Sequence, residues 1–267
     1  MPVSLEQIVA ATRRNVSEAR RSADLRELEG RAQKHVPRGF RQALSKQSLA
    51  GPAIIAELKK ASPSRGLIRA DFHPASLAVE LEGAGAAAIS VLTDAEFFQG
   101  SLQNLQQASV ATHLPCLRKD FIVDEFQLLE ARASHADAVL LIAAALSQRE
   151  LETLAARARS YSLDVLCEVH DEKELERAID AGCDLMGVNS RDLRTFTVDL
   201  QTAVRLADLM PKTVLCVAES GIKNGKDIAR LKAAGYHAFL IGESLMEAPS
   251  PGNALRALLT ESEDKSL

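Results

Sequence analysis

Short runs of apolar residues recur along the chain, and successive runs start about 21 to 34 residues apart. Most of them are apolar throughout instead of alternating with polar residues, which is typical of parallel strands whose sheet is covered by helices. The runs span residues 53–58, 87–93, 115–121, 138–143, 164–169, 185–190, 214–220 and 237–242. We therefore predict eight parallel β-strands.

The segments between the runs have the apolar period of amphipathic helices. Each interval is long enough for a loop, a helix of about ten residues and a second loop. Several segments also carry helix start and stop signals, such as Ser147 with Glu150, Asp171 and the glycines Gly182 and Gly235. The chain thus alternates strand and helix eight times.

Polar residues gather at the carboxyl ends of nearly all the runs. They are Glu57, Lys59, Thr93, Asp94, Lys119, Glu168, Asn189, Glu219 and Ser220. An open eight-stranded sheet would concentrate such residues near one switch point, whereas a closed barrel builds its site from the ends of many strands. The pattern favours an α/β fold, a (β/α)8 TIM barrel.

Residues 1–47 precede the first run and contain two segments of helical period, at 4–21 and 22–34. We expect an N-terminal helical extension over 1–47 and a single catalytic barrel domain over 48–267. The extension can plug the bottom of the barrel, cover its mouth or mediate dimerisation. Its many arginines are interpreted as a solvated face and not as an arm for nucleic acid.

Charge and cysteine usage narrow the function classes. The net charge is −4 and the pI about 5.9, so a general nucleic-acid partner is not expected. No apolar run is long enough to span a membrane, and no signal peptide is recognisable. The cysteines are not in the close pairs of metal sites, which predicts buried free thiols in a reducing cytoplasm and no metal.

Four charged residues fall at equivalent positions of the first, third, fifth and seventh runs. Barrel interiors fill in layers of four side chains from alternate strands, so these can share one layer: Glu57, Lys119, Glu168 and Glu219. Lys59 would then lie one step higher, with Asn189 between. Three cysteines lie one or three residues before their charged neighbours, at Cys116, Cys167 and Cys216, so the same register turns them toward the helices.

Such a cluster has two interpretations. Three carboxylates and two lysines can neutralise one another as a structural ion-pair network. At the mouth of a barrel, however, like charges and partial burial drive pKa values apart and give separate acid and base groups. The second interpretation is favoured because the groups lie at the end of the barrel where active sites form.

The last two runs end in glycine-containing turns, Ser220-Gly221 and Gly242-Glu243. Turns after the seventh and eighth strands, with a short helix N-terminus, form the phosphate site of many barrels. Either glycine alone would indicate only a turn. The segment after the first run, Ser62 to Gly66, reads either as a lid that brings a hydroxyl and a cation to the same ligand or as a surface turn.

With these residues assembled, the chain closely resembles the indole-3-glycerol phosphate synthases of tryptophan biosynthesis. The resemblance runs from residue 54 to 246 through IIAELKKASPSRG, SVLTDAEFFQGS, PCLRKDFIVDEFQ, LLIAAAL, EVHDEKELERA, GVNSRDLRTFTVDL, VAESGI and FLIGESLM. It implies a carbon–carbon lyase (a carboxy-lyase) that converts 1-(2-carboxyphenylamino)-1-deoxyribulose 5-phosphate to indole-3-glycerol phosphate, carbon dioxide and water. It also implies a small phosphorylated aromatic substrate, no cofactor and a monomer or weak homodimer.

The resemblance implies general acid–base catalysis and a role in it for each charged residue of the cluster. Lys119 is the expected acid toward the ribulose carbonyl, because a lysine among carboxylates keeps its proton. Lys59 with Glu57 is expected to assist dehydration. Glu168 is expected either to act as the base or to stabilise positive charge on nitrogen, and the division among these three stays open.

The remaining residues are expected to bind and orient the substrate. Asn189 and Glu219 position hydroxyls and the lysines, whereas Ser220, Gly221, Gly242 and Glu243 hold phosphate with Ser62. Arg191 is a candidate for the substrate carboxylate or a surface arginine. Phe98 and Phe121 form either a slot for the aromatic ring or plain packing, and His170 either reaches the mouth or starts the next helix.

Two rival functions remain at this point. A phosphate-binding isomerase of the same pathway would use a Cys or Asp pair at the mouth, and this chain carries lysines and glutamates there instead. A barrel that only binds a phosphorylated metabolite or a partner protein would be expected to have lost some of its polar set, and this set is intact.

Overall fold

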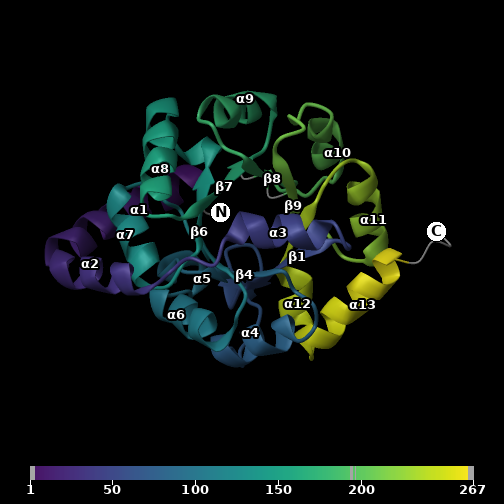
Figure 1. Ribbon diagram of the computed structural model, residues 1–267, viewed down its shortest axis with the longest axis horizontal. Helices are drawn as coiled ribbons and strands as arrows, with labels where there is room; N and C mark the ends of the chain where they lie inside the picture. The colour runs from purple at the N-terminus through teal and green to yellow at the C-terminus, as the bar shows by residue number, and fades with distance from the viewer. Residues whose placement is uncertain (1–3, 193–194, 196, 264–267) are drawn as a thin grey trace.

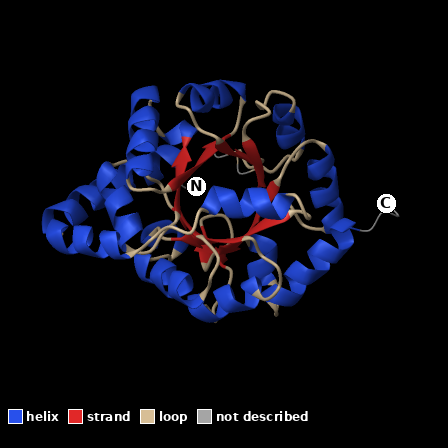
Figure 2. Ribbon diagram, viewed as in Figure 1, coloured by secondary structure: helices blue, strands red, loops and turns tan. Residues whose placement is uncertain are grey.

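The computed structural model describes residues 4–192, 195 and 197–263, and in it eight parallel strands close into a barrel (Figures 1 and 2). The strands are β1 (Ala53–Leu58), β4 (Ala88–Leu92), β5 (Cys116–Lys119), β6 (Ala138–Ile142), β7 (Asp164–Val169), β8 (Leu185–Asn189), β9 (Leu215–Glu219) and β10 (Ala238–Ile241). The ring closes where β1 pairs with both β4 and β10. The predicted (β/α)8 barrel is confirmed, and each strand lies within its predicted run.

Helices cover the outside of the ring (Figure 2). They are α4 (Pro74–Glu82), α6 (Leu102–Ala111), α7 (Glu125–Ala133), α8 (Gln148–Ser160), α9 (Glu172–Asp180), α10 (Gln201–Ala207), α11 (Gly225–Ala233) and α13 (Pro251–Glu263). The predicted start signals are confirmed, because Ser147 and Glu150 form a capping box and Asp171 caps α9. Of the described helices, none has the length and apolarity needed to cross a membrane.

Four short elements at the carboxyl ends of strands complete the mouth of the barrel. They are the hairpin β2 (Ala61–Ser62) with β3 (Gly66–Leu67), the helix α5 (Ala95–Phe98), the turn η1 (Ala143–Ala145) and the helix α12 (Glu243–Glu247). The hairpin occupies the segment interpreted as a lid or a surface turn. Strands of two residues and single helical turns have no measurable period. The sequence therefore carried no signal for the hairpin strands, α5 or η1, whereas a short helix near the last turn was expected as part of the phosphate site and α12 is found there.

Two apolar clusters divide the strand residues between the inside and the outside of the barrel. Ile55, Leu117, Leu166 and Val217 belong to the inner cluster, in the layer beneath the strand ends. Cys116, Cys167 and Cys216 belong to the outer cluster, which packs against the helices. The register predicted from the cysteines is therefore confirmed, and all four cysteines are buried and free.

The N-terminal segment forms the helices α1 (Leu5–Ser22), α2 (Leu25–Lys34) and α3 (Phe40–Ser48). Figure 2 shows α3 lying across one end of the ring of strands. The side chains of Phe40 and Leu44 are completely buried in the inner cluster, so α3 plugs the bottom of the barrel. The sequence pattern did not single out α3, and this helix runs through the domain boundary expected at residue 47.

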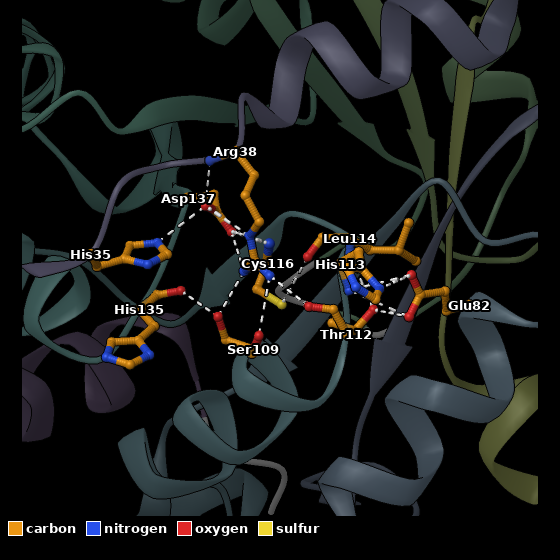
Figure 3. A network of polar contacts seen from close by, with 10 residues as sticks. All are labelled: His35, Arg38, Glu82, Ser109, Thr112, His113, Leu114, Cys116, His135 and Asp137. Carbon is orange, nitrogen blue, oxygen red and sulfur yellow. Dashed lines mark hydrogen bonds and ion pairs between the residues drawn. The ribbon is translucent and has the colours of Figure 1, made fainter.

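A buried carboxylate fastens this plug to the bottom of the barrel (Figure 3). Asp137, which precedes β6, is fully buried and accepts hydrogen bonds from the Arg38 backbone N–H (2.7 Å), the Arg38 guanidinium (Nη2, 2.6 Å) and the Cys116 backbone N–H (2.6 Å). His35 Nε2 lies 3.1 Å from its Oδ1. Burial would raise the pKa of Asp137, but His35 and Arg38 hold it below its usual value.

We expect Asp137→Asn to lower the free energy of unfolding by about 3 kcal/mol, because it leaves the Arg38 guanidinium and several buried donors without a charged acceptor. Urea unfolding followed by circular dichroism measures the loss. The control is Asp71→Asn, whose side chain is 85% exposed and whose effect should stay within about 0.5 kcal/mol. Equal stability of the two variants would contradict the anchoring role of Asp137.

Candidate active site

A cavity of about 1000 Å³ opens at the carboxyl ends of the barrel strands. Every residue predicted from the sequence to act on or bind a ligand lines it: Glu57, Lys59, Ser62, Phe98, Lys119, Phe121, Glu168, Asn189, Arg191, Glu219, Ser220, Gly221, Gly242 and Glu243. Of the other polar strand ends, Asp94 also lines the cavity. Thr93 instead faces a buried cluster, where it donates to Asp120 Oδ2 at 2.6 Å.

Lys119 is shared between two buried carboxylates. Its Nζ lies 3.4 Å from Glu168 Oε2 and 3.5 Å from Glu219 Oε2, and both glutamate side chains are almost completely buried. The three groups come from β5, β7 and β9, which confirms that alternate strands place them in one layer. The ammonium is therefore the cation around which the middle of the mouth is organised.

Burial and charge act in opposite directions on this cluster. Burial lowers the pKa of Lys119, but Glu168, Glu219 and Glu57 outweigh it and raise the pKa well above the usual lysine value. Burial likewise raises the pKa of Glu168, but Lys119 and His170 outweigh it and hold that pKa far below its usual range. At neutral pH the cluster thus holds a protonated amine against an ionised carboxylate.

Glu219 has the opposite character. Burial raises the pKa of its carboxyl to about 8, even though Lys119 opposes the shift, and the negative charge of Glu168 adds to it. Neither of its oxygens has a hydrogen-bond partner, since Lys119 lies at an ion-pair distance only. The pKa values of these two carboxyls are therefore driven apart, so that Glu168 is ionised and Glu219 is protonated. Such a difference is what separates acid from base in one site.

A second lysine–glutamate pair lies at the end of β1. Lys59 Nζ is 2.8 Å from Glu57 Oε1, and the two side chains are two residues apart on the same face of the strand. Burial raises the pKa of Glu57, but Lys59 and then Lys119 outweigh it and leave the pKa below its usual value. The carboxylate and ammonium at the end of the first strand thus form the second half of the same charged cluster.

Two glycines leave room for the carboxylates of Glu219 and Glu57, and each lies on or directly after the strand next to that of its glutamate. A Cβ on Gly187 of β8 would lie 2.0 Å from Glu219 Oε1, and one on Gly242 after β10 would lie 2.3 Å from Glu57 Oε1. Gly187 is not among the glycines with positive φ, so its backbone conformation does not require glycine. Its missing side chain is space that Glu219 occupies.

The turns after the last two strands meet at one side of the cavity. Ser220 and Gly221 have positive φ values of 65° and 82°, which turns the backbone after β9 sharply. A Cβ on Gly221 would lie 2.5 Å from Val198 Cγ1, so the turn also packs closely. Gly242 is the N-cap of α12, and residues of both turns line the cavity.

Two arginines form ion pairs with Glu243 at this side of the cavity. Arg65, from the β2–β3 hairpin, pairs with Glu247 and lies with its Nε 3.4 Å from Glu243 Oε1. Arg191 Nη2 lies 3.6 Å from Glu243 Oε2, and its backbone N–H donates to Asn189 Oδ1. The segment interpreted as a lid, Ser62 to Gly66, thus contacts Glu243 at the predicted phosphate site through the Arg65 guanidinium.

Aromatic and apolar side chains line the opposite wall. The rings of Phe98 and Phe121 lie 6.3 Å apart between centroids, tilted by 39°, and both border the cavity. Leu5 and Ile8 of α1 also border it. The extension therefore reaches both ends of the barrel. The sequence left its contribution to the mouth open, because a helical period does not show what the helix covers.

Comparisons with known proteins point to one family. The family model described as "Indole-3-glycerol phosphate synthase" matches residues 5–258. A protein of that name from Koribacter versatilis is 56% identical over 97% of this chain and 100% of its own. Relatives with the same name from Burkholderia vietnamiensis (48% identical, 94% of this chain and 97% of their chain) and Acinetobacter baumannii (47%, 95% and 94%) are also similar.

Among solved structures, a thiamine phosphate pyrophosphorylase from Pyrococcus furiosus has a TM-score of 0.60 at 17% identity, covering 79% of this chain and 95% of that one. A mandelate oxidase mutant has a TM-score of 0.58 at 16% identity, with 79% and 72% covered. At these identities the likeness concerns the barrel fold alone.

We expect Gly187→Ala to displace the Glu219 carboxylate from Lys119, because a contact of 2.0 Å must open to about 3.5 Å. A crystal structure of the variant measures the displacement. Gly30→Ala is the control, since a Cβ there meets nothing within 4 Å. A folded Gly187→Ala variant with Glu219 still 3.5 Å from Lys119 would show that the glycine is not needed for this space.

Glu219→Gln should stabilise the protein by a margin that grows with pH. Because the pKa of Glu219 is raised to about 8 in the fold, the parent loses stability as pH rises from the unfolded value, about 4.3, through that pH, by up to about 1.4 kcal/mol per unit. Glutamine has no proton to lose. Urea unfolding of both proteins at pH 5, 7 and 9 measures the margin, and a constant margin would contradict the raised pKa.

Proposed function

This chain belongs to the indole-3-glycerol phosphate synthase family, and we propose that Lys119 with its buried glutamates performs the acid–base chemistry of that enzyme. The family closes the indole ring of 1-(2-carboxyphenylamino)-1-deoxyribulose 5-phosphate in tryptophan biosynthesis, with loss of carbon dioxide and water. The enzyme is accordingly a carboxy-lyase, and the isomerase suggested as a rival is not its family.

The observation that carries the assignment is the position of Lys119 between Glu168 and Glu219 at the centre of the mouth. Ring closure makes an aryl carbon attack the ribulose carbonyl, and negative charge builds on the carbonyl oxygen. The developing alkoxide is basic enough to take a proton from an ammonium. Lys119 donates that proton, because the carboxylates around it keep it fully protonated before the reaction.

The later steps require a second acid and a base. After carbon dioxide leaves, the intermediate loses its hydroxyl as water, and the pair of Lys59 and Glu57 supplies the proton for that departure. Glu168, whose pKa is held low, is ionised while positive charge develops on the ring nitrogen and stabilises that charge. In the last step it acts as the base and accepts the proton that the ring loses. Its almost complete burial strengthens this interaction, because little water screens it.

The substrate is held at its two ends. The turns at Ser220, Gly221 and Gly242 direct backbone N–H groups at the phosphate, and Ser62 from the hairpin adds a hydroxyl. Glu243 repels the phosphate by its charge, so it acts by holding Arg65 and Arg191 in place until the substrate arrives.

The aromatic end of the substrate lies opposite. Phe98 and Phe121 form the slot for the ring. Arg191, which lies 3.6 Å from Glu243 on the phosphate side, leaves Glu243 to take the substrate carboxylate. Asn189 donates to Glu168 Oε1 at 3.1 Å and so orients that carboxylate toward the ligand. In this placement the carbonyl of the ribulose lies over Lys119.

The organisation around the site follows from these roles. We propose that residues 48–267 act as one catalytic domain and that the extension over 1–47 serves it by closing the bottom and bordering the mouth. We also propose that the enzyme works in the cytoplasm, because its buried free thiols suit a reducing compartment. It works as a monomer or weak homodimer, and its net charge of −4 argues against a nucleic-acid partner.

Lys119→Ala should lower turnover roughly 10²- to 10⁴-fold, the usual contribution of a general acid, without loss of the fold. Indole fluorescence of the product measures turnover against a low background, since the protein contains no tryptophan. The control is Lys46→Ala on the exposed side of α3, which should keep full activity. Full activity in a folded Lys119→Ala variant would remove Lys119 from the mechanism.

A further inference from the structure

His170 lies directly behind Glu168 without lining the cavity. It follows the last residue of β7 and precedes Asp171, the residue that caps α9. Its side chain is 13% exposed and is packed between the strand end and the first turn of α9. The sequence left open whether His170 reaches the mouth or starts the next helix. His170 does precede α9, and its ring also lies beside Glu168 of the charged layer.

Two carboxylates face the two ring nitrogens of His170. Nδ1 lies 3.0 Å from Glu174 Oε2, and the backbone N–H of His170 donates to that same oxygen at 2.9 Å. Nε2 lies 3.4 Å from Glu168 Oε1. Glu174 belongs to the first turn of α9, whose start is fixed by the Asp171 cap, so the direction of the imidazole ring is fixed as well.

The carboxylate of Glu168 is consequently held from three sides. Its Oε1 accepts a hydrogen bond from Asn189 Nδ2 at 3.1 Å and faces His170, while its Oε2 faces Lys119 at 3.4 Å. Of these partners, Lys119 and Asn189 border the cavity and are available to the substrate. His170 is the cation that the substrate does not reach.

We propose that His170, held by Glu174, is a positioning residue that keeps Glu168 oriented and ionised after Lys119 has given up its proton. The proposal rests on the proposed function, in which Lys119 is the acid. Once Lys119 is neutral, Glu168 would share the layer with the ionised Glu57 and the protonated Glu219, and Lys59, which pairs with Glu57 at 2.8 Å, would be the remaining cation there. A carboxylate beside a like charge takes up a proton more readily, so Glu168 would lose the charge that its role requires.

An imidazolium behind Glu168 prevents this loss because the reaction does not consume it. Burial lowers the pKa of His170, but Glu168 and Glu174 outweigh it and raise the pKa to about 10. A doubly protonated ring carries an N–H on each nitrogen, so Nδ1 donates to Glu174 while Nε2 lies at an ion-pair distance, 3.4 Å, from Glu168 without a hydrogen bond. The groups that face the ring are Glu168 from its own strand and Glu174 from α9.

The protonation of His170 can be observed in the unmodified protein. Nuclear magnetic resonance of protein labelled with ¹⁵N in histidine should show both ring nitrogens of His170 protonated at pH 8, with the signal assigned by its disappearance in His170→Gln. A neutral ring at that pH would overturn the proposal. This measurement needs no catalytic activity, so its result is independent of whether the proposed function is right.

Kinetics of two variants then test the effect on Glu168. His170→Gln removes one cation, so Glu168 should take up a proton more readily once Lys119 has become neutral. The value of kcat should therefore fall by a larger factor at pH 5 than at pH 8, with KM changed less than kcat. Glu174→Gln should instead lower kcat on the alkaline side of the pH profile, because His170 then loses its proton at a lower pH. His113→Gln is the control: that ring is 98% exposed beside Glu82, and its variant should keep the parent profile.

A merely structural role predicts a different outcome. If His170 only fills space, His170→Gln lowers kcat by the same factor at every pH and leaves both limbs where they are. That result, or a Glu174→Gln profile identical to that of the parent, would overturn the proposal.

Discussion

The structure depends on one ammonium shared by buried carboxylates. Lys119 contacts Glu168 and Glu219 at 3.4 and 3.5 Å, directly above an apolar layer of the barrel. Each of these charges would be strongly unfavourable at that depth if it stood alone. Together they give a fixed arrangement in which the proton donor, the ionised carboxylate and the protonated carboxyl are all present before the substrate binds.

The rest of the mouth can be understood as support for this cluster. Gly187 and Gly242 leave the space in which Glu219 and Glu57 lie. Asn189 and His170 hold Glu168 from above and behind, and Lys59 balances Glu57. Because these supports come from several strands, the site exists only when the ring is closed. The plug at the bottom, fastened through Asp137, therefore serves the chemistry at the other end by stabilising that closed ring.

Much of this arrangement could be predicted from the sequence, because alternate residues of a buried strand must face opposite sides. The offsets between Cys167 and Glu168 and between Cys216 and Glu219 therefore fixed which residues face inward, and the structure confirms that register. The helix caps at Ser147 and Asp171 were readable for a similar reason, since a capping signal acts within a few residues of its own position.

Other features were beyond the sequence pattern because they depend on long-range packing. The plug formed by α3 and its anchor at Asp137 join residues about a hundred positions apart. The reason for Gly187 is a carboxylate on another strand, and the partner of His170 on α9 is visible only once the helix is docked. A pattern of polar and apolar residues shows which face a side chain takes, but it does not show what that side chain meets there.

The central role of Lys119 is tested most directly by a crystal structure of the enzyme with a substrate analogue whose ribulose carbonyl is reduced to an alcohol, which cannot cyclise. We expect Lys119 Nζ to lie within hydrogen-bonding distance of that alcohol oxygen, with the phosphate at the turns of Ser220, Gly221 and Gly242. An analogue bound in the same cavity with Lys59 on that oxygen, and Lys119 still held between Glu168 and Glu219, would contradict the central role given to Lys119.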